Sequence, residues 1–140
     1  MTNILRPDGK NIAMGYDTGG RLSTVTIPFG AGTGNYTYGY DATSGNLTSI
    51  TSPSGEGLGF GYDGSLLLGS TWSGTVSGSV SRVYDNNFRI TSRSVNGGNT
   101  IAFTYDNDSL LTNAGSETLA YDPANGLLSP LRLVMPPRLV

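Results

Sequence analysis

Apolar and polar residues alternate along several short stretches of this chain, and each stretch ends in a tyrosine. In four of them apolar side chains stand two and four positions before that tyrosine: Ile12/Met14/Tyr16, Tyr36/Tyr38/Tyr40, Leu58/Phe60/Tyr62 and Ile101/Phe103/Tyr105. Side chains two positions apart lie on the same face of a β-strand. The pattern therefore predicts strands whose apolar core face is marked by the tyrosine.

An aspartate directly follows the tyrosine that ends each stretch. The dipeptide occurs six times, at steps of 24, 22, 22, 21 and 16 residues: Tyr16-Asp17, Tyr40-Asp41, Tyr62-Asp63, Tyr84-Asp85, Tyr105-Asp106 and Tyr121-Asp122. Periods of this size are typical of repeat architectures. We interpret all twelve residues as structural. The tyrosine buries its ring and keeps its hydroxyl near a polar partner, and the aspartate accepts hydrogen bonds from turn amides.

A second strand is predicted to begin shortly after each aspartate. An apolar residue recurs five positions after it, with one inserted residue in the second repeat: Leu22, Leu47, Leu68, Ile90, Leu111 and Leu127. The residues in between are rich in Asp, Asn and Gly, which favour turns. Each repeat is therefore predicted to be an antiparallel β-hairpin. In later copies Leu66, Phe88 and Ser109 replace the turn glycine, so we expect the turn geometry to vary there.

The segments between hairpins also have turn composition, at residues 28–34, 52–57 and 96–99. Residues 69–81 are rich in Ser, Gly and Thr but keep Trp72, Val76 and Val80 at even spacing, so we expect strand there. No window has a helical period. The prediction is an all-β fold, an antiparallel β-hairpin repeat array that forms a curved sheet strip over residues 1–128. A proline-rich tail without the repeat follows at 129–140.

Charge argues against nucleic acid as a partner, and the lack of long apolar stretches argues against a membrane span. Charged residues make up 13% of the chain and the net charge is -2, which provides no basic surface for nucleic acid. No stretch is long and apolar enough for a membrane span, and Met1–Ala13 lacks the apolar run of a signal peptide.

Candidate catalytic residues are few. The chain contains no histidine and no cysteine, which removes Ser-His and Cys-His pairs and the commonest metal ligands. Paired carboxylates would suffice for glycoside hydrolysis, but most aspartates recur at the repeat position. Asp106-Asn107-Asp108 resembles the start of a calcium loop but lacks its glycine and distal glutamate. We expect no enzyme activity, no catalytic residue, no cofactor and no metal.

Carbohydrate binding is the alternative function that the residues allow. Sugars stack their apolar faces on aromatic rings while polar groups meet the hydroxyls, an arrangement that a β-sheet can present. Trp72, Tyr36 and Tyr38 would supply the rings, with Arg82 nearby. The competing interpretation is that these aromatic side chains are packed in the core.

The repeat resembles that of the Rhs or YD-repeat family, whose copies read approximately Tyr-Asp-x-x-Gly-Arg-Leu-Thr-Ser-Ile. The most similar copy here runs from Tyr16 to Val25, and only Arg21 and Arg89 occupy the arginine position. The resemblance covers about residues 10 to 128. It implies a structural role, since long arrays of such hairpins form hollow shells in bacterial toxins and in teneurins, and some members have been linked to carbohydrate. It also implies a secreted or cell-surface location as part of a longer protein.

The same resemblance raises one further activity and one structural problem. Asp122-Pro123 is similar to part of the self-cleaving aspartyl site of some long family members, whose second part is missing here. Six repeats are too few to enclose a cargo, and a strip of hairpins exposes strand edges and an apolar face. We therefore expect a homo-oligomer, formed by strand-edge or open-face association.

Overall fold

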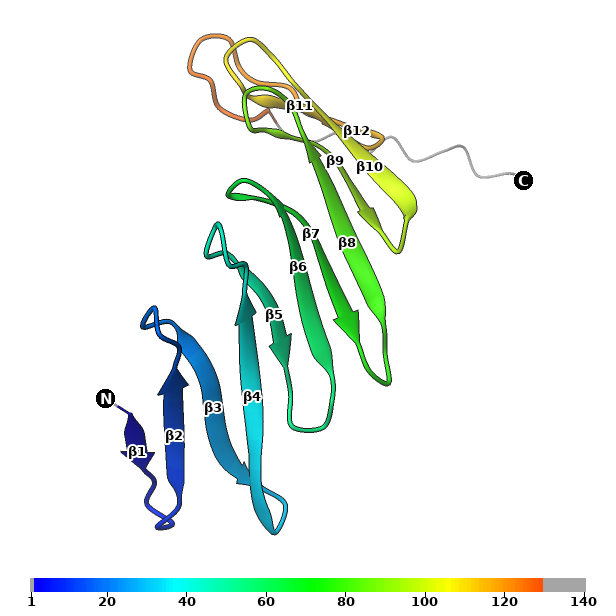
Figure 1. Cartoon of the computed structure of the whole chain (residues 1–140). Coiled ribbons are helices and arrows are strands. Elements are labelled where there is room, and N and C mark those ends of the chain that lie inside the picture. The colour runs from blue at the N-terminus through cyan, green and yellow to red at the C-terminus, as the bar shows by residue number, and fades with distance from the viewer. Residues whose placement is uncertain (1, 130–140) are drawn as a thin grey trace, which may run out of the picture.

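The chain forms one antiparallel sheet that is not closed into a barrel (Figure 1). The structure is a computed structural model and describes residues 2–129. Within that range no helix occurs, and therefore none that could cross a membrane. The strands pair in chain order: β1 (Asn3–Leu5), β2 (Asn11–Tyr16), β3 (Leu22–Phe29), β4 (Gly32–Tyr40), β5 (Leu47–Thr51), β6 (Gly57–Asp63), β7 (Leu66–Ser73), β8 (Gly78–Tyr84), β9 (Ile90–Val95), β10 (Gly98–Tyr105), β11 (Leu111–Ala114) and β12 (Glu117–Thr118).

The predicted hairpin array is confirmed. The Tyr-Asp turns join β2 to β3, β4 to β5, β6 to β7, β8 to β9 and β10 to β11, and they line one long side of the strip in Figure 1. The sixth hairpin is reduced to one bridge between Tyr121 and Leu128. The sequence pattern missed β1, which pairs with β2 ahead of the first repeat. Apart from Ser129, the predicted tail at 129–140 lies outside the described residues.

In the third hairpin the second strand begins earlier than predicted, since β7 starts at Leu66 rather than Leu68, and in the third and sixth hairpins the predicted apolar residue is not the one opposite the tyrosine. Tyr62 pairs with Leu67 rather than Leu68, and Tyr121 bridges to Leu128 rather than Leu127. The third turn is one residue shorter than the first, and the sixth is one residue longer. A fixed offset of five residues from the aspartate could not detect these changes in turn length. Leu68 and Leu127 are accordingly 38% and 67% exposed.

The turns keep a left-handed residue even where the sequence lacks glycine. Gly20 has φ +78°, and its counterparts Phe88 and Ser109 have φ values of 63° and 67°. In the third hairpin the shorter turn uses Gly64, with φ +57°, so Leu66 does not replace the glycine as expected. Left-handed backbone is costly for side chains other than glycine. Phe88 therefore holds a strained conformation while 71% exposed.

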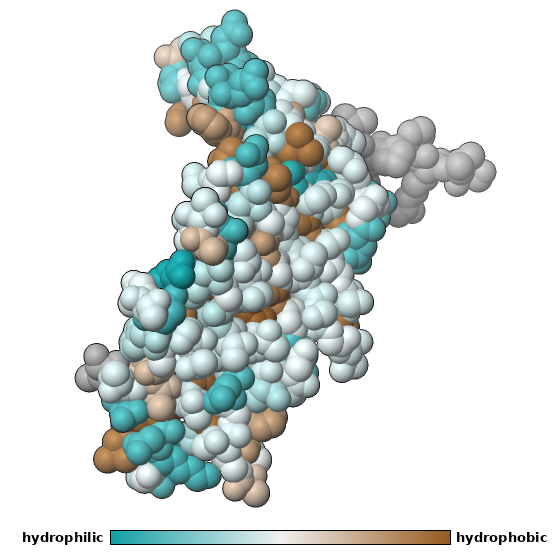
Figure 2. Space-filling model, viewed as in Figure 1, coloured by the Kyte–Doolittle hydropathy of each residue, from teal (hydrophilic) through white to brown (hydrophobic). Residues whose placement is uncertain are grey.

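The register separates the side chains into two chemically different faces. Directly opposite residues share a face, so the row Tyr38, Ile50, Leu58 and Trp72 crosses four strands on one side, which we call the tyrosine face. The opposite side, the hydroxyl face, carries rows of small polar residues and glycine, including Gly39/Ser49/Gly59/Thr71 and Gly69/Ser81/Ser94. Near-neutral colours predominate in Figure 2, where hydrophobic atoms form separate groups rather than one continuous area.

No core covers the tyrosine face. Among the described residues none is buried, and the repeat tyrosines range from half-buried to 47% exposed at Tyr16. The expectation that the tyrosine buries its ring is therefore wrong for the isolated chain, because a single sheet has no second layer to pack against. The strand predicted across residues 69–81 is also interrupted: β7 ends at Ser73, and Val76 lies in the following turn, 74% exposed.

Candidate functional site

The repeat tyrosines join neighbouring hairpins. In four of them the hydroxyl donates a hydrogen bond to a main-chain carbonyl of the preceding hairpin: Tyr40 to Leu22 at 2.8 Å, Tyr84 to Leu67 at 3.0 Å, Tyr105 to Ile90 at 2.8 Å and Tyr121 to Leu111 at 3.0 Å. Each acceptor is the residue opposite the tyrosine of its own hairpin. The tyrosine therefore reaches back by one repeat.

These carbonyls are available because pairing between hairpins stops short of the Tyr-Asp turns. The β3–β4 register starts at Thr24 and Thr37, two residues beyond Leu22. An unpaired carbonyl in the sheet interior is costly unless another donor reaches it, and the tyrosine hydroxyl is that donor. Tyr62 is the exception: within the described part of the chain its hydroxyl has no such bond to Leu47.

Five of the six repeat aspartates close their turns as predicted, and Asp63, in the shorter third turn, accepts no hydrogen bond from the described residues. Asp17 Oδ1 accepts hydrogen bonds from the amides of Gly19 and Arg21, both at 2.9 Å. Asp85, Asp106 and Asp122 each accept from turn amides in the same way. The bond from the Arg21 amide, followed by that from its side chain, lowers the pKa of the Asp17 carboxyl below its usual value. The carboxylate is thus held ionised by the turn that it closes.

Two arginines extend this arrangement across a seam between hairpins. Arg21 Nε lies 2.7 Å from Asp17 Oδ2, and its guanidinium carbon lies 4.6 Å from the centroid of the Tyr40 ring. Arg89 repeats the geometry with Asp85 at 2.8 Å and the Tyr105 ring at 4.7 Å. A planar guanidinium can bond a carboxylate along its edge while an aromatic ring stacks on its face. At these two seams aspartate, arginine and the next tyrosine therefore form one unit, which we call the arginine clasp.

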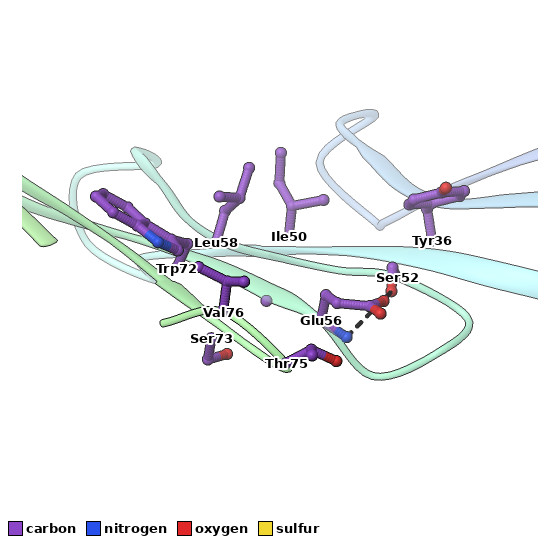
Figure 3. A pocket seen from close by; sticks show the side chains of 10 residues that line it. Tyr36, Ile50, Ser52, Glu56, Leu58, Trp72, Ser73, Thr75 and Val76 are labelled. Carbon is purple, nitrogen blue, oxygen red and sulfur yellow. Dashed lines mark hydrogen bonds between the residues drawn. The ribbon is translucent and has the colours of Figure 1, made fainter. Parts of the chain in front are cut away.

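One apolar cavity lies on the tyrosine face, away from the Tyr-Asp turns. Its volume is about 410 Å³, and Tyr36, Ile50, Leu58, Trp72 and Val76 supply most of its lining. Figure 3 shows Tyr36, Ile50, Leu58 and Trp72 projecting from the same side of the sheet, whereas Ser73 projects from the other. The cavity is apolar and open to solvent, and the turns that follow β5 and β7 form its border.

Glu56 provides the polar edge of this cavity. Its carboxylate accepts hydrogen bonds from the hydroxyls of Ser52 and Ser54, and its amide donates to Ser52 Oγ at 3.1 Å (Figure 3). The Ser52 hydroxyl, then that of Ser54, lowers the pKa of Glu56. Glycoside hydrolysis requires two facing carboxyl groups, and the cavity lining contains one.

The indole of Trp72 occupies space that is free because Gly78, on the next strand, has no side chain. A Cβ atom at Gly78, directly opposite on β8, would lie 2.3 Å from Cζ2 and 2.6 Å from Cε2 of the indole. The ring therefore lies over Gly78. This glycine positions one wall of the cavity.

The four residues proposed for carbohydrate binding are only partly brought together. Trp72 and Tyr36 line the same cavity, whereas Tyr38 lies in the same cross-strand row as Trp72 but does not line the cavity. Arg82 lies elsewhere, at a second cavity near the Tyr-Asp turns, so its expected proximity to the aromatic residues is wrong. Neither Glu56 nor Val76 was predicted to line a site, because both belong to turns with no repeated motif.

The described residues contain no cluster of three or more carboxylates that could hold a metal ion. No curated protein matches the chain. A family model, described as teneurin YD-shell, matches residues 1–135. That match spans the hairpins, the tyrosine bonds between them and the arginine clasps, and it shows that the chain belongs to the teneurin YD-shell family.

Proposed function

We propose that this chain is a non-catalytic, self-associating wall segment of a YD-type shell. The family suggests a structural shell module. The observation that supports self-association is the lack of any buried side chain among the described residues, although the tyrosine face carries rows of apolar and aromatic side chains, interrupted by Arg82 and Arg93. Most hydrophobic stabilisation of a sheet comes from covering such a face. A second layer must come from outside these twelve strands.

The size of the tyrosine face suits that role. Twelve strands about 4.8 Å apart form a strip about 50 Å wide, and the eight strands of six to nine residues are about 20 to 30 Å long. One face therefore offers about 1,000 Å² or more, while a stable protein interface needs roughly 800 Å² per partner. Leu58, Val95 and Ile101 are 44, 49 and 46% exposed. Another copy of the chain would cover them.

The two edges of the sheet offer a second mode of association. β1 has three residues and pairs on one side with β2, and the other end of the sheet finishes with β12 and the Tyr121–Leu128 bridge. Unpaired strand edges template the addition of further strands. Edge pairing would extend the array from copy to copy, and face pairing would give a two-layered sandwich.

Sedimentation and light scattering over a range of concentrations test this proposal. We expect a defined oligomer that Leu58→Glu dissociates if the faces pair and that Asn3→Pro, which removes an outward-facing amide of β1, dissociates if the edges pair. Thr71→Glu places the same charge on the hydroxyl face, one strand away, and should leave the oligomer intact. A wild-type chain that folds and stays monomeric at every concentration would contradict the proposal.

A carbohydrate-binding function is the second candidate, supported by the cavity that Trp72 and Tyr36 share. Both rings stand on one face beside an ionised carboxylate, Glu56, which can accept hydrogen bonds from sugar hydroxyls. A glycan array tests it. Trp72→Ala should abolish any signal, whereas Tyr38→Ala, outside the cavity, should retain it. A blank array with the folded wild-type chain would eliminate this candidate.

A further inference from the structure

Of the five seams between neighbouring hairpins, two contain an arginine clasp, and the seam between the third and fourth hairpins is one of the three that lack it. In the first hairpin Arg21 precedes Leu22, the residue opposite the tyrosine; in the third hairpin Leu66 precedes the equivalent residue, Leu67. Leu66 therefore stands at the arginine position. The two groups that a clasp would join are still present there, as Asp63 at the turn and Tyr84 on the next hairpin.

Asp63 is available for a partner. Its side chain is exposed and, within the described residues, accepts no hydrogen bond and forms no ion pair. Asp17 and Asp85, at the same position in other hairpins, each bond a guanidinium. The ring of Tyr84 likewise has no described guanidinium over it, although its hydroxyl makes the usual bond to the Leu67 carbonyl at 3.0 Å.

A cavity of about 540 Å³ occupies this seam. Asp63 and Tyr84 both line it, together with Leu66, Asn86, Phe88 and Arg82. The volume falls in the range of small-ligand sites. In the intact clasp at the fourth seam, Arg89 Nη1 also donates to Ser109 on the next turn, at 3.1 Å. Asn86 lies on the next turn in the present seam and offers the same kind of acceptor. The cavity therefore combines the groups that surround the arginine elsewhere.

We propose that this seam binds an arginine side chain presented by a partner polypeptide. The guanidinium donates to the Asp63 carboxylate and stacks on the Tyr84 ring, as Arg21 and Arg89 do within the chain. The methylene stem packs on Leu66 and Phe88, which is 71% exposed. Lysine fits less well, because its ammonium lacks the planar fork that both bonds and stacks.

The charge and the unpaired Nη1 of Arg82 favour a polypeptide ligand over a free guanidinium compound. The charge of Arg82 opposes a second cation, and the Nη1 atom is buried without a hydrogen-bond partner. An unsatisfied buried donor favours a ligand that brings an acceptor. The main-chain carbonyl beside a bound arginine would provide one, which methylguanidinium cannot.

Titration of the full chain with N-acetyl-arginine N-methylamide, followed by NMR, tests the proposal. We expect saturable binding in the millimolar range, with shifts at Asp63, Leu66 and Tyr84. The equivalent blocked lysine and methylguanidinium should bind more weakly, and blocked citrulline, which lacks the charge, should not bind. No binding of the arginine compound, equal binding of citrulline, or preferential binding of a blocked glutamate at Arg82 would each overturn the proposal.

Three variants assign the site. Asp63→Asn should weaken binding by about tenfold or more without changing thermal unfolding, since the carboxylate has no described partner to lose. Asp108→Asn removes another exposed turn carboxylate without such a bond and should leave binding unchanged. Leu66→Arg supplies the missing clasp from within the chain and should block the site. Unchanged affinity in both Asp63→Asn and Leu66→Arg would refute the assignment.

Discussion

The Tyr40 hydroxyl donates a 2.8 Å hydrogen bond to the main-chain carbonyl of Leu22, which belongs to the preceding hairpin. Arg21, the neighbour of Leu22 in the chain, lies over the Tyr40 ring. One tyrosine therefore satisfies a carbonyl that the strand ladder leaves unpaired and also provides the stacking surface for an arginine. The dipeptide at each turn thus stabilises the boundary with the preceding repeat as well as its own hairpin.

Loss of this hydroxyl should weaken the seam. We expect Tyr40→Phe to lower the free energy of unfolding by about 1 kcal/mol, because it leaves the Leu22 carbonyl unsatisfied while keeping the ring. Tyr62→Phe is the matched control, since the Tyr62 hydroxyl has no bond of this kind in the described structure, and its loss should be smaller. Denaturant unfolding measures both, and equal losses would contradict the role assigned to the hydrogen bond.

The turn carboxylates should make stability depend on pH in the acid range. The pKa values of Asp17 and Asp85 are lowered, first by the backbone hydrogen bonds from Arg21 and Arg89. A lowered pKa in the folded state means that the stabilisation is complete above the unfolded-state pKa of about 3.9 and is lost as pH falls through the folded-state value. The unfolding free energy should therefore be flat near neutrality and fall as the pH drops below about 5.

Substitution can assign that acid dependence to a particular turn. Asp17→Asn keeps an oxygen for the turn amides but removes the titrating group and the ion pair with Arg21, so the fall in stability at low pH should become shallower. Asp108→Asn, whose carboxylate closes no turn, should keep the wild-type slope. Urea unfolding at a series of pH values measures this, and identical slopes in all three proteins would exclude Asp17 as a source.

Phe88 should be replaceable with a gain in stability. Its φ of 63° is left-handed, and glycine adopts that conformation without steric cost. We expect Phe88→Gly to raise the free energy of unfolding by about 0.5 to 1 kcal/mol, after the greater flexibility of glycine in the unfolded chain is subtracted. Phe88→Ala removes the same ring but keeps the strain. A gain in the alanine variant equal to that in the glycine variant would show that strain is not the cause.

A methyl group at Gly78 should displace the indole of Trp72. The Cβ atom would lie 2.3 Å from the ring, and overpacking of this kind typically costs about 1 to 3 kcal/mol. Trp72 is the chain's single tryptophan, so its fluorescence reports the change directly. Gly32→Ala, where the new Cβ atom would meet nothing within 4 Å, is the control. An unchanged emission spectrum in Gly78→Ala would show that the indole does not depend on Gly78.

The alternation of apolar residues and the recurrence of Tyr-Asp are enough to predict hairpins, their number and the separation of two faces. These properties depend on side chains within a few positions of one another, whose directions follow from strand geometry. The turn lengths escape such reasoning, because a turn with one residue more or less can still be closed by glycine or by a strained residue such as Phe88. The predicted residues Leu68 and Leu127 are for that reason one position away from Leu67 and Leu128, which lie opposite Tyr62 and Tyr121.

The contacts between hairpins depend on the three-dimensional arrangement. Tyr40 and Leu22 are 18 positions apart, and Trp72 and Tyr36 are twice as far, so only the accumulated register of several strand pairs brings each pair together. The vacant clasp at Asp63 and Tyr84 is equally invisible in the sequence. The repeat period determines that β-hairpins form. The strand register and the uncovered tyrosine face determine which side chains come together to form cavities and contact surfaces.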